Sequence, residues 1–107
     1  MIDWTQIEAL RGDVGDGFAN LVEVFLDEMD SAITRLDPHA TPPQMEAHLH
    51  FLKGSALNLG FADFAALCAE GEARAGQGGA VDVGPIRQLY LDSRSVFMAG
   101  LSDRRAA

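Results

Sequence analysis

The 107-residue sequence is poor in lysine and in cysteine. Lys53 is its only lysine, and 8 basic residues stand against 16 acidic ones, which gives a formal net charge of −8. Nucleic acids and anionic membranes are bound through clustered lysine and arginine, so we expect neither as a partner. Cys68 stands alone, which excludes an intrachain disulfide and a cysteine-rich zinc site and is consistent with a reducing compartment.

Long apolar runs and catalytic motifs are also missing. No stretch approaches the ~18 apolar residues of a membrane span, and the start, Met1 to Trp4, has no basic region followed by an apolar run. We therefore expect a cytoplasmic protein. The sequence has no phosphate-binding glycine loop, no dinucleotide-binding glycine pattern, no His-Glu-x-x-His and no nucleophile elbow. We expect no ATP site, no cofactor and no metal site in this chain.

The apolar residues that are present recur at helical spacing nearly throughout, without the alternation typical of strands. The pattern predicts a short helix that begins after Asp3 and ends at Gly12, and a second, strongly amphipathic helix over residues 16–36. Thr41 and Gln44 have the spacing of a capping box, with prolines between them, and predict the start of a third helix.

The third helix is expected to run to about residue 59, where Gly60 ends it. A fourth helix follows to about residue 75, and Asp82 caps a last helix whose tail, residues 103–107, we expect to fray. Helices of this length joined by short loops favour antiparallel neighbours. The prediction is an all-α fold, an up-and-down antiparallel four-helix bundle with a short additional N-terminal helix, forming one monomeric domain over residues 1–107.

The third predicted helix contains Gly54 in its interior. Glycine there lowers the stability of a helix by about 1 kcal/mol relative to alanine, so we expect a functional or structural reason for its presence. Helical spacing separates a buried face from an adjoining outward face; the first holds Leu49, Leu52, Ala56 and Leu59, the second His50, Lys53, Gly54 and Leu57. An unperturbed imidazole is mostly neutral at pH 7 and offers a nucleophilic nitrogen. A lysine one turn further on can attract the roughly two negative charges of a phosphoryl group.

His48 is the alternative to His50 as the reactive histidine. It lies about 200° further round the helix and has no lysine or glycine at the matching offsets. The same geometry argues against a metal site, because the two histidines cannot point at one ion, even with His39 added from a loop. Cys68 falls on an apolar face and is expected to be a small buried hydrophobic residue.

The run His50-Phe51-Leu52-Lys53-Gly54-Ser55, with Gly60 ten residues after the histidine, resembles the signature of histidine-containing phosphotransfer (HPt) domains of bacterial and fungal phosphorelays. The resemblance covers essentially the whole chain, because that family is a helical bundle of about this length with the phosphorylatable histidine in mid-helix. Ala56 stands where many members carry a second serine, which we interpret as a packing variation.

The resemblance implies a stoichiometric phosphotransfer protein that is not a classical enzyme. His50 would accept a phosphoryl group from a receiver aspartyl phosphate and pass it to another receiver aspartate, with Mg²⁺ supplied by the receivers. Lys53 would assist electrostatically and Gly54 would give the partner room to approach. The implied partners are response-regulator receiver domains and a hybrid sensor histidine kinase. The fourth helix of such domains lines the histidine, which makes Glu72 a polar neighbour to which we assign no function.

Three apolar residues of the predicted helices, Val24, Phe51 and Leu57, do not all fit inside the bundle and are candidates for a receiver-docking patch, although single exposed apolar residues are also common. The alternative function is a non-catalytic helical docking module that binds and sequesters a receiver or kinase. The combination of His50, Lys53 and Gly54 speaks against it, because docking alone needs no nucleophile. We further expect a free-standing protein and not a fragment of a hybrid kinase.

Overall fold

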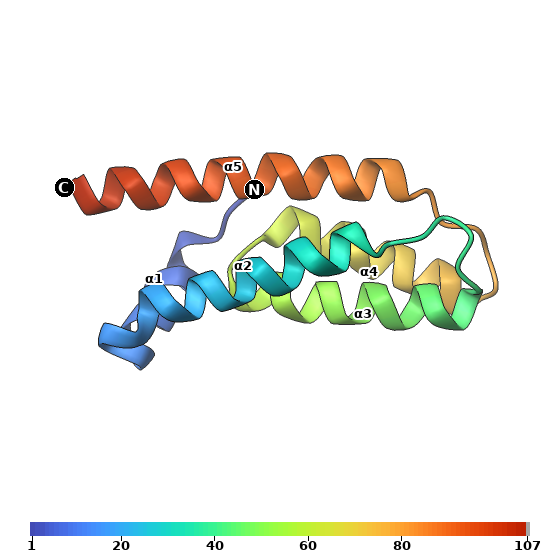
Figure 1. Cartoon of the computed structure of the whole chain (residues 1–107), viewed down its shortest axis with the longest axis horizontal. Helices are drawn as coiled ribbons and strands as arrows, with labels where there is room; N and C mark the ends of the chain where they lie inside the picture. Colours follow the sequence, from blue (N-terminus) through green and yellow to red (C-terminus); the bar gives the residue numbers. More distant parts are fainter. Residues whose placement is uncertain (107) are drawn as a thin grey trace.

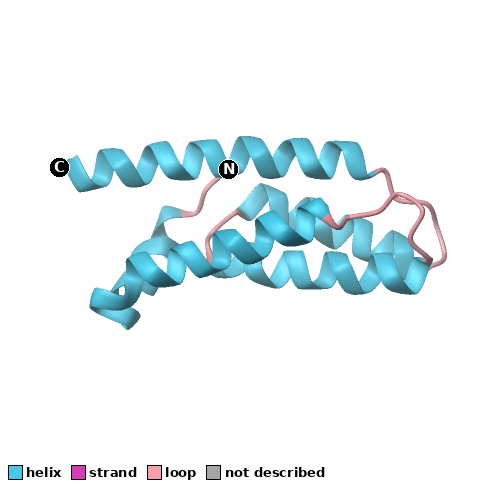
Figure 2. Cartoon of the chain, in the orientation of Figure 1, coloured by secondary structure: helices cyan, strands magenta, loops and turns pink. Residues whose placement is uncertain are grey.

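Five α-helices and one 3-10 turn make up residues 1–106, the part of the chain that the computed structural model describes. They are α1 (Trp4–Val14), the 3-10 turn η1 (Gly15–Gly17), α2 (Phe18–Thr34), α3 (Pro42–Asn58), α4 (Ala62–Gly76) and α5 (Val83–Ala106). Helices α2 to α5 run up and down side by side in an elongated bundle of 46 × 22 × 21 Å, with α1 at one end (Figures 1 and 2). The predicted all-α bundle with a short extra N-terminal helix is confirmed. Within residues 1–106, no helix is both long and apolar enough to cross a bilayer.

The second helix begins at Phe18, after the 3-10 turn, and not at residue 16 as predicted. Three other predicted helix starts are confirmed by side-chain caps. The hydroxyl of Thr41 accepts a hydrogen bond from the backbone N–H of Gln44 at 3.3 Å, and the Gln44 side chain accepts one from the Thr41 N–H at 3.0 Å. The carboxylate of Asp3 accepts from the N–H three residues on, at 3.3 Å, and that of Asp82 from the N–H two residues on, at 3.2 Å. Each cap satisfies a backbone donor that has no partner inside its own helix.

The predicted end of the first helix at Gly12 is wrong. Helix α1 continues to Val14 and stops where Gly15 adopts a φ of 58°, the left-handed region that glycine enters without a steric penalty. The backbone N–H of Gly15 donates to the carbonyl of Arg11 and closes the last turn. A Cβ added to Gly12 would meet nothing within 4 Å. Glycine at this position lowers the stability of the helix slightly but does not end it.

The expectation that the tail frays is wrong for residues 103–106, which stay helical as the end of α5. The guanidinium of Arg104 lies over the ring of Trp4, 4.2 Å from its centroid, and pairs with the Glu8 carboxylate at 3.3 Å. These two contacts hold the last turns of α5 against α1. Ala107 lies outside the described residues.

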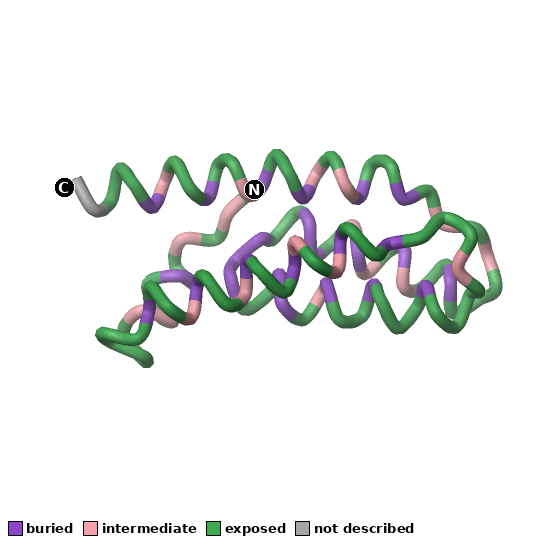
Figure 3. The backbone as a smooth tube through the Cα atoms, viewed as in Figure 1, coloured by how far each residue is buried: buried purple, intermediate pink, exposed green. Residues whose placement is uncertain are grey.

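The core forms where the apolar stripes of the helices face inward (Figure 3). On α3 the predicted buried face is confirmed, because none of its four residues has any exposed surface. Cys68 of α4 is also fully buried, and burial raises the pKa of its thiol to about 12, so it is the inert apolar residue that was predicted. The largest fully buried side chains are those of Tyr90, Phe61, Phe64, Phe97, Ile7 and Met29.

Helix α5 is joined to α2 through one carboxylate. Asp30 accepts hydrogen bonds from the hydroxyl of Tyr90 and from two guanidinium nitrogens of Arg94, at 3.1 and 3.2 Å. Burial raises the pKa of Tyr90 above its ordinary value, and the neighbouring Asp30 raises it further. The cluster fixes the register of two helices that are neighbours in the bundle but far apart in sequence.

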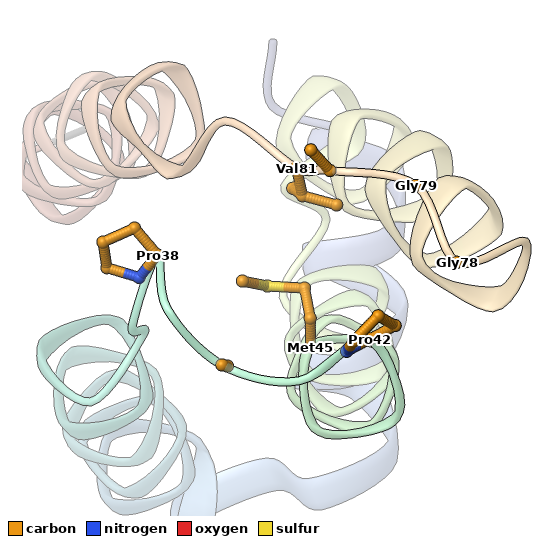
Figure 4. A pocket seen from close by; sticks show the side chains of 8 residues that line it. Pro38, Pro42, Met45, Gly78, Gly79 and Val81 are labelled. Carbon is orange, nitrogen blue, oxygen red and sulfur yellow. The ribbon is translucent and has the colours of Figure 1, made fainter.

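At one end of the bundle, the loop before α3 and the loop before α5 surround a hollow of about 250 Å³ (Figure 4). Met45 extends into it from α3 toward Pro38 on the opposite side, with Pro42 next to Met45 and Val81 above it in this view. All of its lining residues are Pro, Gly, Ala, Met or Val, and therefore no side chain there offers acid-base or nucleophilic chemistry.

Candidate functional site

The candidate site lies on the hairpin formed by α3 and α4, the two helices that pack most extensively on each other. The hairpin turns at Gly60, whose φ is 71°, and the backbone N–H of Asp3 donates to its carbonyl at 2.7 Å. In an antiparallel hairpin, residues equally far from the turn face each other. His50 and Glu72 each stand eleven residues from Phe61, and their side chains meet across the two helices.

Glu72 contacts both side chains that the sequence singled out. Its Oε1 lies 2.7 Å from Nδ1 of His50, and its Oε2 lies 2.7 Å from Nζ of Lys53. The exposed fractions of the three side chains are 70% for His50, 29% for Lys53 and 18% for Glu72. The histidine thus stands outermost, above a half-buried ion pair.

The hydrogen bond from Lys53 lowers the pKa of Glu72 below its ordinary value, and the bond from His50 lowers it further, although burial acts in the opposite direction. Glu72 is therefore ionised at neutral pH, and an ionised carboxylate only accepts hydrogen bonds. Nδ1 of His50 must carry the hydrogen of this 2.7 Å contact. In the neutral ring, Nε2 is then the nitrogen with the free lone pair.

Lys53 is less open to solvent than its predicted place on the outward face of the helix suggests. Its side chain is 29% exposed because it lies along the hairpin and ends on Glu72. Long lysine side chains commonly bury their methylenes while the ammonium finds a charged partner. The single lysine is therefore one turn from His50, as predicted, but it is already paired.

Gly54 is exposed, and a Cβ added to it would meet no other part of the chain within 4 Å. Nothing within residues 1–106 therefore requires glycine at this position, and its cost to helix propensity is not offset by packing. The outward placement that the sequence predicted is confirmed. The role of Gly54 toward a partner remains a prediction.

His48 and His50 are on different sides of α3. His48 lines a hollow between α2 and α3, together with Ala32, Arg35 and Phe51, whereas His50 is bonded to α4. Among the described residues, 1–106, no three His, Cys, Asp or Glu side chains come together in an arrangement that would hold a metal ion.

The three apolar residues that were expected to fall outside the core are exposed. Val24 on α2 is 52% exposed, and Phe51 and Leu57 on α3 are 44% and 55% exposed. Phe51 is the residue after His50, and Leu57 lies two turns further along α3. Exposed apolar area therefore accompanies the histidine on its own helix.

Glu72 is the residue whose importance was underestimated from the sequence. The equal distances of His50 and Glu72 from Phe61 were a usable signal, because they place Glu72 opposite His50 once α3 and α4 are taken as an antiparallel pair. The signal was incomplete, since facing positions alone do not tell which side chain will form the hydrogen bond.

Comparison with known protein families gives one match. The model of the Hpt domain matches residues 20–92, which is more than half of the chain and includes the whole α3–α4 hairpin. No curated protein matches the chain, and no solved structure does.

Proposed function

The chain belongs to the Hpt domain family, whose members transfer phosphoryl groups in phosphorelays, and we propose that His50 is the residue that carries the phosphoryl group. Hpt domains interact with receiver domains and kinases and are phosphotransfer modules rather than classical enzymes. The observation that best supports His50 is its 2.7 Å contact with Glu72, on a ring whose side chain is 70% exposed. His48 has no such partner among the hydrogen bonds of the described residues.

The transfer step follows from this arrangement. The lone pair on Nε2 of His50 attacks the phosphorus of a receiver aspartyl phosphate and forms an N–P bond. The P–O bond to the receiver breaks, and its electron pair leaves with the aspartate carboxylate. The Nδ1 hydrogen stays in its bond to Glu72, which stabilises the positive charge that the ring acquires. Transfer to a second receiver reverses these bonds, and the neutral imidazole is the leaving group.

Lys53 would change its partner during the step. In the unphosphorylated protein its ammonium neutralises Glu72 at 2.7 Å. A phosphoryl group brings about two negative charges to the neighbourhood of the same ammonium, one helical turn away. Lys53 would then be shared between the phosphoryl oxygens and Glu72, which reduces the electrostatic cost of placing the group beside a carboxylate.

Gly54 would provide clearance for the partner, because the exposed face of α3 has no side chain at that position. We propose that the partners are receiver domains, including that of a hybrid sensor kinase, and that they supply Mg²⁺ together with the groups that hold it. The chain itself would act stoichiometrically, as a monomer, without an ATP site. Val24, Phe51 and Leu57 would form the apolar part of the docking surface.

The test is a phosphotransfer assay with radiolabelled receiver domains and, separately, with phosphoramidate as a small phosphoryl donor. Wild type and His48→Ala are expected to take up an acid-labile, alkali-stable label, and His50→Gln is expected to take up none. Circular dichroism of each variant shows whether the bundle has folded. Label on His50→Gln would overturn the assignment.

The same assay distinguishes phosphotransfer from the alternative function, in which the protein binds a receiver without accepting its phosphoryl group. A sequestering module would bind a phosphorylated receiver equally well as wild type and as His50→Gln, and neither would become labelled. Measuring the dissociation constant of both proteins for one receiver, alongside the label, distinguishes docking from transfer.

A further inference from the structure

The hollow between α2 and α3 is lined by Phe51, the residue that directly follows His50. It has a volume of about 120 Å³ and is lined by Ala32 of α2, by Arg35 directly after that helix, and by His48 and Phe51 of α3. Phe51 directly follows His50 and is 44% exposed, so the hollow and the histidine share one stretch of α3. A partner that covers His50 and extends toward α2 must also cover this hollow.

The size of the hollow indicates what fits. Sites for cofactors and small molecules usually measure about 300–1,000 Å³, and this one is well below that range. A single side chain inserted from another protein is the occupant that suits it.

The charge of the residues that line the hollow indicates what kind of side chain the partner would insert. Within residues 1–106, Arg35 takes part in none of the ion pairs, and neither do Arg11, Arg74 and Arg87; of these four, Arg35 is the one that lines this hollow. In a chain with a net charge of −8, an unpaired guanidinium beside an apolar wall is a local site for a negative group. A guanidinium binds a carboxylate through two parallel hydrogen bonds, and His48 adds a ring nitrogen to the same rim.

We propose that this hollow receives an aspartate or glutamate side chain of the receiver domain that exchanges phosphoryl groups with His50. The carboxylate pairs with Arg35, and the methylenes pack against Phe51 and Ala32. The contact discriminates among receivers, because a receiver with a basic residue at that place would face Arg35. This inference rests on the proposed function of His50 and adds to it a determinant of partner choice.

The test compares two phosphoryl donors on the same set of variants. One donor is a receiver domain that labels the wild-type protein, phosphorylated with acetyl phosphate, and the other is phosphoramidate, which needs no docking surface. Arg35→Glu reverses the charge of the rim. Arg74→Glu is its matched control, because Arg74 is also exposed, lies in the last turn of α4, and changes the net charge equally.

With the receiver, Arg35→Glu is expected to lower the rate of transfer at low receiver concentration at least tenfold, since like charges would face each other across the interface. Arg74→Glu is expected to stay within about twofold of the wild-type rate. Labelling by phosphoramidate is expected to be the same for all three proteins. Equal receiver rates for Arg35→Glu and Arg74→Glu would overturn the inference and leave Arg35 with only a stabilising role at the end of α2.

A second pair of variants tests the hollow without changing charge. Ala32→Trp fills it, and Ala19→Trp places the same ring on α2 in the groove beside α5. Only Ala32→Trp is expected to slow transfer from the receiver, and both are expected to be labelled by phosphoramidate. If phosphoramidate failed to label His50 in the wild-type protein, the proposed function would fall, whereas equal receiver rates for the two Trp variants would remove only the docking inference.

Discussion

Lys53 Nζ lies 2.7 Å from Glu72 Oε2, so the only lysine of the chain is paired before any phosphoryl group reaches His50. The pair has two consequences. It holds the ammonium beside Glu72, and under the proposed function Lys53 would be shared between Glu72 and the phosphoryl oxygens during transfer. A lysine with no partner would search more conformations and would lose more side-chain entropy when the phosphoryl group arrived.

Lys53→Ala is expected to slow transfer to His50 about ten- to hundredfold, because a charge-assisted hydrogen bond to the phosphoryl group contributes about 1.5–3 kcal/mol. The cost in stability should be small, about 1 kcal/mol or less, since the pair with Glu72 is only partly buried. Rapid-quench labelling and thermal unfolding measure the two quantities. Lys53→Arg keeps the charge and is the control; an unchanged transfer rate for Lys53→Ala would contradict the role given to the ammonium.

Glu72→Gln is expected to alter how stability depends on pH. Because the folded pKa of Glu72 is lower than its ordinary value of 4.5, the ionised carboxylate stabilises the fold above about pH 4.5. That contribution is lost as the pH falls through the lowered pKa. The free energy of unfolding of the wild type should therefore exceed that of Glu72→Gln by up to about 1 kcal/mol near pH 6, and the difference should shrink as the pH falls below 4.5.

Urea unfolding of both proteins across this pH range gives the difference directly. A gap that stayed constant, or grew as the pH fell, would mean that the carboxylate is not stabilised by Lys53 and His50 in solution. Glu70→Gln, which changes an exposed acid on the same helix, is the control for the change in net charge.

Gly54→Ala is expected to separate stability from function. The added methyl group meets nothing else in the chain within 4 Å, and alanine is the better helix former, so the isolated protein should gain up to about 1 kcal/mol. Transfer from a receiver should become slower, because the methyl group stands on the face that the partner covers. Labelling by phosphoramidate should not change. A variant that was more stable and equally fast with the receiver would show that clearance at this position is not needed.

Gly60→Ala and Gly78→Ala form a matched pair at positive φ. Both positions, at 71° and 77°, cost an alanine about 1–2 kcal/mol through backbone strain. At Gly78 a Cβ meets nothing within 4 Å, but at Gly60 it lies 2.5 Å from the carbonyl oxygen of Asp3. We expect Gly60→Ala to lose about 3 kcal/mol or more and Gly78→Ala to lose about half of that or less. Equal losses of stability in the two variants would mean that the backbone around Asp3 moves aside at little cost in free energy.

The helix starts were predictable because their signals are local. Thr41 and Gln44 satisfy each other over three residues, and Gly60 needs only its own backbone geometry to end the helix. The end of α1 was misplaced because Gly12 and Gly15 look alike in sequence, and only the folded chain shows which of them adopts positive φ. The helical tail was missed for a related reason, since Arg104 is held by Trp4, at the other end of the chain.

The residues of the site could be predicted from the sequence, but the contacts that Glu72 makes with them could not. His50, Lys53 and Gly54 lie on one helix, so spacing alone places them relative to each other. Glu72 is on a different helix, and the depth of Lys53 depends on it. Facing positions follow from the antiparallel hairpin, but hydrogen bonds across it depend on side-chain conformations that the sequence does not specify.

The construction of the site within one helical hairpin also bears on how the protein folds. His50 and Glu72 are joined by a short stretch of chain, whereas the stacking of Trp4 on Phe97, with ring centroids 5.9 Å apart, requires nearly the whole chain to be closed. The entropy cost of closing a loop rises with its length, so α3 and α4 can pair before the chain ends meet. Opening at the ends, visible by hydrogen exchange, would then leave the His50–Glu72 contact intact.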